Sequence, residues 1–292
     1  MDKYIVVLLS IILPGAIGLL GLIGLTRGLY SSSSGVNGEL IVYTPPVLAK
    51  IVEEFSGFFE ERYGVRVNVV VDSTGRLLTR LETTMQGDIL VTADHYFMEE
   101  AVKRGLVDPE STRRISIIVP VVLFHRDSSF KPLDIRDLPR LSMEGAKIAI
   151  ADPKASPFGR MAYNLLVKTS VYSVLENRLY VYSDVGVVAR YLSLGEVDIA
   201  ILPHIVKYWY PSELEIVWLK PEDISGIASC QLIGITRYAV NKGLAGLFIE
   251  EFTRYASSLD PVRTGFVYNI SDLSKIAPYD YRGIELPVVC SL

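Results

Sequence analysis

Apolar and polar residues alternate along the chain in blocks that predict strands followed by helices. Short apolar runs of the kind that form buried strands fall at 40–43, 65–71, 88–92, 147–151, 179–182 and 198–202. After each of the first five runs, apolar residues recur every three or four positions, as Leu48, Val52 and Phe55 do after the first run. Because strands that alternate with helices form parallel sheets covered by helices, the sequence predicts an α/β fold.

The strand and helix blocks form two series, which predicts two lobes. Two longer candidate strands, Arg114–Phe124 and Ile227–Ile235, lie between the series and could each pass from one lobe to the other. We therefore assign residues 38–117 plus 236–292 to lobe one and residues 118–235 to lobe two, each a mainly parallel sheet flanked by helices. A chain of 292 residues is long enough for two such units.

The N-terminal part, residues 1–36, has a different character. Tyr4–Leu25 carries no charge and is long enough to cross a bilayer as a helix at ~1.5 Å per residue. No small-residue cleavage site and no cysteine for lipid attachment follow it before Arg27, and Ser31–Ser34 is typical of a flexible tether. We expect a retained membrane anchor with the folded part on the extracytoplasmic side. The alternative is a cleaved signal that leaves a secreted or periplasmic protein.

Charge and cysteine content narrow the possible partners. The 29 basic and 33 acidic residues give a net charge of −4, whereas a nucleic-acid-binding surface needs a basic excess, so we expect no nucleic-acid partner. The two cysteines, Cys230 and Cys290, are too few for a zinc site. Outside the cell they could form one disulfide, but spacing alone leaves open whether they pair or stay free.

Motifs of common enzymes are absent from the sequence. It contains no GxxxxGK[ST], GxGxxG, HExxH or GxSxG, and His95, His125 and His204 show no ligand spacing. We therefore expect neither a catalytic residue nor a cofactor or resident metal. An extracytoplasmic hydrolase is a rival hypothesis, but no nucleophile–base motif supports it.

Four predicted loops lie between a strand and the helix that follows it, and they carry hydroxyl groups or prolines. Their residues are 44–46, 73–75, 156–159 and 183–185. Helix starts have free N–H groups and a positive dipole end, so several of them around one point bind an anion without a basic side chain. In parallel sheets this point lies at the carboxyl ends of the strands. The alternative is that the hydroxyls only cap their helices.

Three stretches resemble the substrate-binding proteins of molybdate-type ABC importers. They are GDILVTADHYFMEEAVKRGLVDPESTRR at 87–114, IAIADPKASPFGRMAYNLL at 148–166 and DVGVVARYLSLGEVDIAIL at 184–202. The family's equivalents read like ADLFISAD, DPxxxPxG, DVxxAL and GExDxGIVY, and the DPxxxPxG motif is intact from Asp152 to Gly159. The resemblance covers about residues 40–266. It implies the two-lobed periplasmic-binding-protein fold, with the ligand in a cleft between the lobes.

The same resemblance implies a set of ligand-binding residues. Family members hold a tetrahedral oxyanion between the lobes by neutral hydrogen bonds. The family's hydroxyl loop falls on Ser73 and Thr74, and its backbone donors fall on Phe158 and Val185.

Two of the family's ligand side chains are replaced in this chain. The first-loop serine falls on Val47, and the tyrosine that follows the GIV strand falls on Pro203. Thr44 could supply the first hydroxyl from three residues earlier, and His204 could reach the place of the tyrosine. The resemblance therefore implies ligand binding by Thr44 and His204 in addition to the four positions that match.

By this resemblance the chain is an extracytoplasmic binding protein that delivers molybdate or tungstate to an ABC permease. An alternative ligand is sulfate or another anion. An alternative function is that of a membrane-tethered sensor domain of the same fold. Ferric iron is another alternative ligand, because LIVYTPP and STGRLLTRL also resemble an iron-binding family. In that family adjacent tyrosines follow the GEV strand, whereas Ile205 and Val206 follow it here, and Tyr208 and Tyr210 come later. The resemblance assigns no role to residues 268–292.

Overall fold

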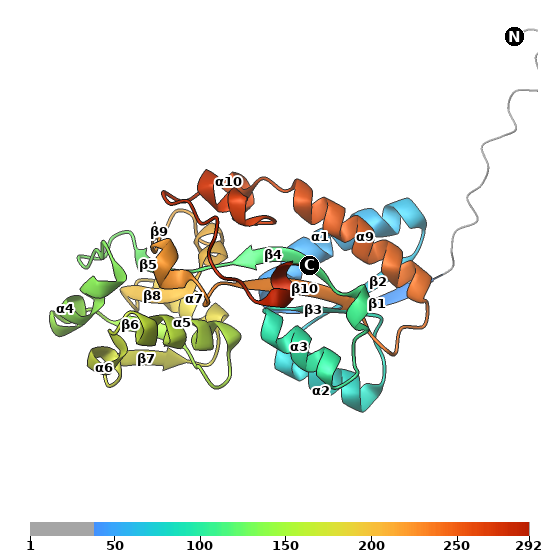
Figure 1. The fold of residues 1–292 in the computed structure, drawn as a ribbon, viewed down its shortest axis with the longest axis horizontal. Helices are drawn as coiled ribbons and strands as arrows, with labels where there is room; N and C mark the ends of the chain where they lie inside the picture. The colour runs from blue at the N-terminus through green and yellow to red at the C-terminus, as the bar shows by residue number, and fades with distance from the viewer. Residues whose placement is uncertain (1–37, 292) are drawn as a thin grey trace, which may run out of the picture. The chain divides into compact units, whose positions relative to one another are not determined.

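The computed structural model describes residues 38–291, which contain two five-stranded sheets (Figure 1). The first has the strand order β2-β1-β3-β10-β4 and consists of β1 (Glu39–Thr44), β2 (Arg66–Val71), β3 (Ile89–Thr92), β4 (Arg113–Ile118) and β10 (Ser229–Ile235). The second has the order β7-β6-β8-β5-β9 and consists of β5 (Pro120–His125), β6 (Ile148–Ala151), β7 (Leu179–Tyr182), β8 (Ile199–Pro203) and β9 (Leu214–Val217). The predicted α/β class is confirmed.

Both sheets combine parallel and antiparallel pairs. β1 pairs in parallel with β2 and β3, and β6 pairs in parallel with β7 and β8. β10 is antiparallel to β3 and β4, and β5 is antiparallel to β8 and β9. Because the parallel strands of a sheet point the same way, the loops that follow them leave the sheet at one edge, where α/β proteins bind ligands.

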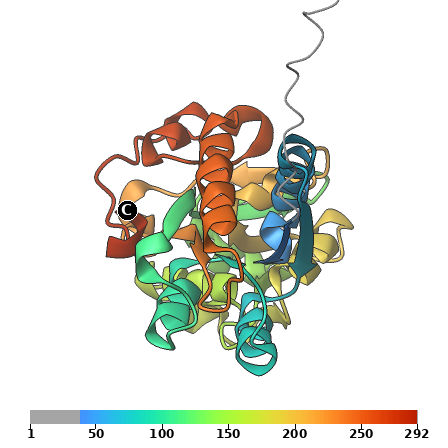
Figure 2. The same ribbon diagram turned by 90° about the vertical axis from the view of Figure 1, so that its right-hand side faces the viewer.

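Helices cover each sheet. The first sheet carries α1 (Pro46–Tyr63), α2 (Thr74–Thr84), α3 (His95–Lys103) and α9 (Lys242–Ser258), with α1 and α9 on one face and α2 and α3 on the other (Figures 1 and 2). The second carries α4 (Leu138–Met143), α5 (Pro157–Lys168), α6 (Tyr172–Leu175), α7 (Val185–Ser193) and α8 (Pro221–Ile224). Phe55 of α1 meets Phe248 and Phe252 of α9 at centroid distances of 5.0 and 5.2 Å. Such pairs add ~0.5–1.5 kcal/mol each beyond their buried area.

The segments that connect the two sheets differ from the prediction. Residues 114–124 do not form one strand but belong to β4 and β5, which lie in different sheets and are separated by Val119. β10 lies wholly in the first sheet, where it pairs with β3 and β4. The second lobe therefore ends before Ser229 and not at residue 235, because β10 fills the position between β3 and β4.

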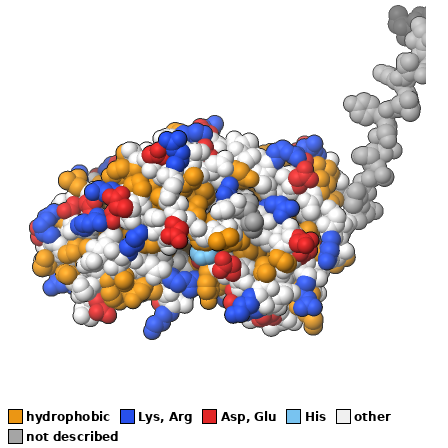
Figure 3. All heavy atoms as spheres, in the orientation of Figure 1, with side chains coloured by type: hydrophobic (Ala, Val, Ile, Leu, Met, Phe, Trp, Pro, Cys, Tyr) orange, Lys and Arg blue, Asp and Glu red, His pale blue; other side chains and the backbone are white. Residues whose placement is uncertain are grey.

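Charged side chains of both signs are mixed on the surface. On the face shown in Figure 3, lysines and arginines lie among aspartates and glutamates, without one continuous basic area. That no nucleic acid binds this protein stays a prediction.

The C-terminal segment contacts both lobes. α10 (Pro261–Thr264) lies against η3 (His204–Tyr208), and the buried Tyr281 donates its hydroxyl proton to the Leu219 carbonyl at 2.7 Å, so this part contacts lobe two. The chain then returns to η5 (Val288–Ser291) beside β4 and β10 of lobe one. The assignment of all of 236–292 to lobe one was therefore incomplete. The remaining 3-10 turns are η1 (Pro109–Ser111), η2 (Ile135–Asp137) and η4 (Ile270–Lys275).

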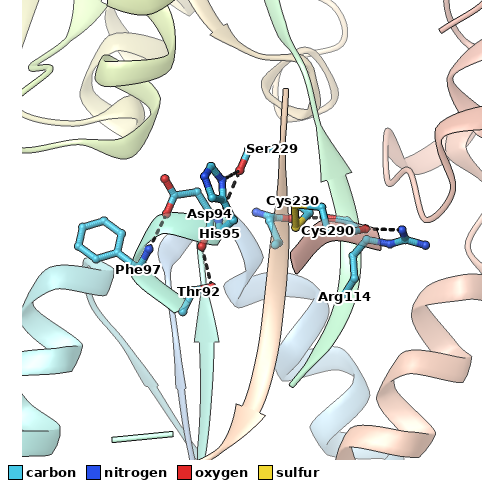
Figure 4. Close-up of a disulfide and its surroundings, with 10 residues drawn as sticks. Thr92, Asp94, His95, Phe97, Arg114, Ser229, Cys230 and Cys290 are labelled. Atoms are coloured by element: carbon cyan, nitrogen blue, oxygen red, sulfur yellow. Dashed lines mark hydrogen bonds between the residues drawn. A yellow bond between two sulfur atoms is a disulfide. The ribbon is translucent and has the colours of Figure 1, made fainter. Parts of the chain in front are cut away.

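A disulfide fixes the end of this segment to the first sheet. Cys230 of β10 and Cys290 of η5 are bonded, and Arg114 of β4 donates to the Cys290 carbonyl at 2.6 Å (Figure 4). The bond closes a loop with a sequence separation of 60, for which the chain-entropy model gives about 4 kcal/mol of stabilisation. Disulfides persist in oxidising compartments, so the bond fits a protein that works outside the cytoplasm.

The predicted membrane anchor, Tyr4–Leu25, lies outside the described residues. Among residues 38–291, the helices are all too short or too polar to span a membrane. The anchor therefore stays a prediction.

Candidate functional site

A cavity of about 700 Å³ lies between the two lobes, at the carboxyl ends of their parallel strands. The loops after β1, β2 and β3 form its wall on lobe one, and the starts of α5 and α7 form its wall on lobe two. All four loops expected to bind an anion contribute residues to this single cavity. The arrangement places the starts of four helices around one space, where their first N–H groups have no partner within the helix.

Thr74 begins α2 and is 3% exposed. Its Oγ1 accepts a hydrogen bond from the Ala93 N–H at 3.3 Å, so the hydroxyl proton is left to donate to a ligand. Ser73 holds the N-cap position, but its side chain makes no capping bond. Next to it, the Asp72 carboxylate accepts from the Ser73 N–H at 2.6 Å and pairs with Arg76. The start of α2 therefore brings the hydroxyls of Ser73 and Thr74 and uncapped backbone N–H groups to the cavity.

The start of α5 explains the glycine of the DPxxxPxG motif. A Cβ at Gly159 would lie 2.4 Å from the Ala151 carbonyl oxygen, so only glycine lets the helix begin directly against the end of β6. Ser156 caps the helix by accepting from the Gly159 N–H at 3.4 Å. Phe158 lines the cavity, and within residues 38–291 its N–H has no hydrogen-bond partner.

The start of α7 has the same construction. Both carboxylate oxygens of Asp184 are engaged, one by the Val187 N–H at 3.0 Å and the other by the Ser183 hydroxyl at 2.9 Å. Val185 and Gly186 follow at the first two helical positions and line the cavity. Because Asp184 is occupied as a cap, the N–H groups of these two residues are the available donors of this loop.

The first loop supplies no hydroxyl. Pro45, Pro46 and Val47 line the cavity at the start of α1, and this helix has no side-chain cap. Thr44, proposed above as a replacement donor, is fully buried in β1 and does not line the cavity, and its Oγ1 has no hydrogen-bond partner in the part of the chain that the structure describes. The structure therefore does not bring Thr44 to the cavity.

His204 is also not at the cavity. Its ring is fully buried, its Nδ1 accepts from the Val119 N–H at 3.3 Å, and its Nε2 donates to the Gly265 carbonyl at 2.9 Å. Burial lowers the pKa of His204 to about 4, so the ring is neutral at pH 7. His204 therefore links Val119, which connects the two sheets, to Gly265 in the C-terminal segment. Both ring nitrogens are used, so neither is left for a ligand.

Several cavity residues were not found from the sequence, and Arg76 and Trp209 have the largest side chains among them. Arg76 lies on the exposed side of the first turn of α2. Its helical spacing from Ser73 was the only sign in the sequence that it could line the same cavity. Trp209 follows η3 and carries no motif that could have indicated it.

One contact between the lobes lies next to the cavity. Arg160 of α5 approaches the Asp94 carboxylate at 3.8 Å and lies over the Tyr96 ring at 4.1 Å from its centroid. Burial raises the pKa of Asp94, which also caps α3 by accepting from the Phe97 N–H (Figure 4). Among residues 38–291, His, Cys, Asp and Glu form no group of three that could hold a metal ion.

Comparison with known proteins agrees with this geometry. A family model described as "Bacterial extracellular solute-binding protein" matches residues 40–252. The molybdate-binding protein ModA of Rhodobacter capsulatus is 23% identical over 188 residues, which is 64% of this chain and 72% of that protein.

Two solved structures share the fold. The periplasmic molybdate-binding protein of Azotobacter vinelandii superposes with a TM-score of 0.63 at 18% identity, covering 79% of this chain and 99% of that one. The periplasmic binding protein AfuA of Actinobacillus pleuropneumoniae, solved with fructose 6-phosphate bound, gives a TM-score of 0.65 at 16% identity and covers 84% and 92%. At these identities the structures show that the fold is the same, so the predicted two-lobed architecture is confirmed.

The structural role of His204 predicts a specific pH dependence of stability. With a folded pKa of about 4 against ~6.5 when unfolded, only the unfolded chain binds a proton at this site between these values. The free energy of unfolding should therefore fall as the pH drops below ~6.5, by up to roughly 3 kcal/mol at pH 4. His204→Gln keeps one donor and one acceptor, so it should lose this part of the pH dependence. Urea unfolding of both proteins at a series of pH values measures it; equal slopes in the two proteins would refute the assignment.

Proposed function

The chain belongs to the family of bacterial extracellular solute-binding proteins, and from this we propose that it captures a small oxyanion between its lobes and delivers it to an ABC permease. The observation that carries the proposal is the set of donors around the cavity. The Thr74 hydroxyl and the N–H groups of Phe158 and Val185 come from the starts of three helices on both lobes. Helix starts bind anions through such donors without a basic side chain.

Capture by both lobes explains how such a site selects its ligand. When the lobes close on the anion, water leaves the cavity, and every donor must find an oxygen of the ligand. A donor left without a partner costs ~1–3 kcal/mol. The number and placement of the donors therefore select the anion by shape. The family is one of binding proteins, which agrees with the expectation that this chain is not an enzyme.

Molybdate and tungstate are the first ligands to test. The relatives in Rhodobacter capsulatus and Azotobacter vinelandii are molybdate-binding proteins, and four of the positions carried over by resemblance line this cavity: Ser73, Thr74, Phe158 and Val185. Sulfate and other anions remain alternatives, because Val47 and Pro203 replace two of the family's ligand side chains. Ferric iron has less support, since neither Tyr208 nor Tyr210 lines the cavity.

Thr74→Val tests the donor set. The substitution keeps the branched shape but removes the hydroxyl, so affinity for the bound oxyanion should fall by roughly ten- to a hundredfold, the equivalent of ~1.5–3 kcal/mol. The Ala93 N–H also loses its acceptor, so the free energy of unfolding should fall by ~1–3 kcal/mol. Isothermal titration with molybdate, tungstate, sulfate and phosphate measures the first effect, and urea unfolding measures the second.

Two further variants separate binding from stability. Thr74→Ser keeps the hydroxyl and should bind within a fewfold of the parent. Thr79→Val is the matched control on the same helix. The exposed Thr79 hydroxyl donates only to the Gly75 carbonyl, so its loss should leave affinity for the anion unchanged. If Thr74→Val binds the anion as tightly as Thr79→Val does, Thr74 is only a structural residue.

We also propose that the uncharged run Tyr4–Leu25 anchors the protein in the membrane on the extracytoplasmic side. Family membership supports an extracellular solute-binding domain, and a tether would keep that domain near its permease. Protein extracted from washed membranes with detergent should then retain this run, with an N-terminus at or before residue 4. N-terminal sequencing measures this, and a start near residues 31–37 would mean that a signal has been cleaved.

A further inference from the structure

The cavity is larger than a bare oxyanion. Its volume of about 700 Å³ lies in the range of ~300–1,000 Å³ found for sites of larger organic ligands. A tetrahedral oxyanion has the size of a few water molecules, on the order of 100 Å³ at ~30 Å³ per water. Closure of the lobes would reduce the volume, so size alone does not decide the ligand class. The chemistry of the walls does.

Much of the wall is apolar side-chain surface. Pro45, Pro46 and Val47 line the lobe-one side, and Phe158 and Trp209, whose indole N–H is its one hydrogen-bond donor, line the lobe-two side. The first of these loops is the one in which the resembling family places a hydroxyl. A bare oxyanion presents oxygen in every direction, so an apolar wall leaves oxygens without donors and weakens binding by roughly tenfold or more for each. Apolar walls favour a ligand that is itself apolar on that side.

A charged pair at the cavity fits an organic ligand as well. Arg76 bonds to Oδ1 of Asp72, and Oδ2 of Asp72 has no hydrogen-bond partner within residues 38–291. Molybdate and tungstate have no proton to donate to this oxygen at neutral pH. A hydroxyl group on an organic ligand could donate to Asp72, while its anionic group accepts from Arg76 or Thr74.

We infer that the oxyanion held in this cavity is the anionic group of a small organic molecule, a phosphate or carboxylate on an apolar body that packs on Trp209. This inference rests on the proposed function and concerns the same site. The donors at the starts of α2, α5 and α7 hold the anionic group. The apolar part of the ligand packs against Pro45, Pro46, Val47 and Trp209.

The two tryptophans of the chain provide a matched experiment. Trp209 lines the cavity, whereas Trp218 lines a separate pocket near His204. In full-length Trp218→Phe protein in detergent, Trp209 is the only tryptophan and its emission reports directly on the cavity. The ligands to titrate are phenyl phosphate, glycerol 3-phosphate and benzoate as organic anions, molybdate and inorganic phosphate as bare oxyanions, and phenol as an uncharged body.

We expect at least one organic anion to bind tenfold or more tightly than both inorganic anions and phenol, and to change the emission of Trp209. Calorimetry on Trp209→Leu should show that affinity for this organic anion falls tenfold or more, whereas affinity for inorganic anions changes less than twofold. Trp218→Phe should bind all ligands like the parent.

The outcomes separate this inference from the proposed function. If molybdate or phosphate binds as tightly as every organic anion and Trp209→Leu leaves all affinities unchanged, the ligand is not an organic anion. The proposed capture of an oxyanion then still stands. If phenol binds as tightly as phenyl phosphate, the anionic group is not recognised. If no anion binds, the proposed function fails together with the inference.

Discussion

Backbone N–H groups at the start of a helix have no partner inside the helix, and this constraint organises the cavity between the lobes. Capping side chains satisfy some of them, as Ser156 does for Gly159 and Asp184 does for Val187. Among residues 38–291, the N–H groups of Phe158 and Val185 have no hydrogen-bond partner, and both residues line the cavity. Helix starts present a partial positive charge to the cavity, and Arg76, Asp72 and Asp184 add full charges of both signs to its lining.

The rest of the fold serves to place these helix starts opposite one another. Parallel strands bring three loops of each lobe to one edge, and Gly159 allows α5 to begin in contact with β6. The lobes are joined at Val119 and by the segment before β10, and the C-terminal segment adds contacts to both. His204, Tyr281 and the Cys230–Cys290 disulfide fasten that segment, which lies beyond the part of the chain that matches the family.

Much of the fold could be predicted because apolar periodicity reports burial directly. The strand expected over 179–182 has the predicted bounds, and a helix, α7, follows it as the apolar spacing indicated. The place of β10 could not be predicted, because an antiparallel strand inserted into a parallel sheet has the same buried, apolar sequence as its neighbours. Whether Cys230 and Cys290 pair depends on the path of the C-terminal segment, which shows no regular pattern.

Residues at the expected helix starts, among them Thr74, Phe158 and Val185, line the cavity, whereas the two residues assigned only as replacements for lost side chains do not. Phe158 and Val185 follow from the helix starts whatever their side chains are. Thr44 and His204 were assigned by proximity in sequence, but one is turned into the core and the other is bonded to backbone groups on both sides. Trp209 lies in an irregular segment after β8, so no periodicity placed it at the cavity.

Hydrogen exchange of the full-length protein tests most directly whether helix starts from both lobes hold an anion. Exchange of the amides in the first turns of α2, α5 and α7 would be followed by mass spectrometry, with and without molybdate, tungstate, sulfate, phosphate or phenyl phosphate. Because an amide that donates to a bound ligand exchanges slowly, the account predicts that at least one anion slows all three turns together, at one concentration. Exchange that no anion slows, or that slows on one lobe only, would contradict it.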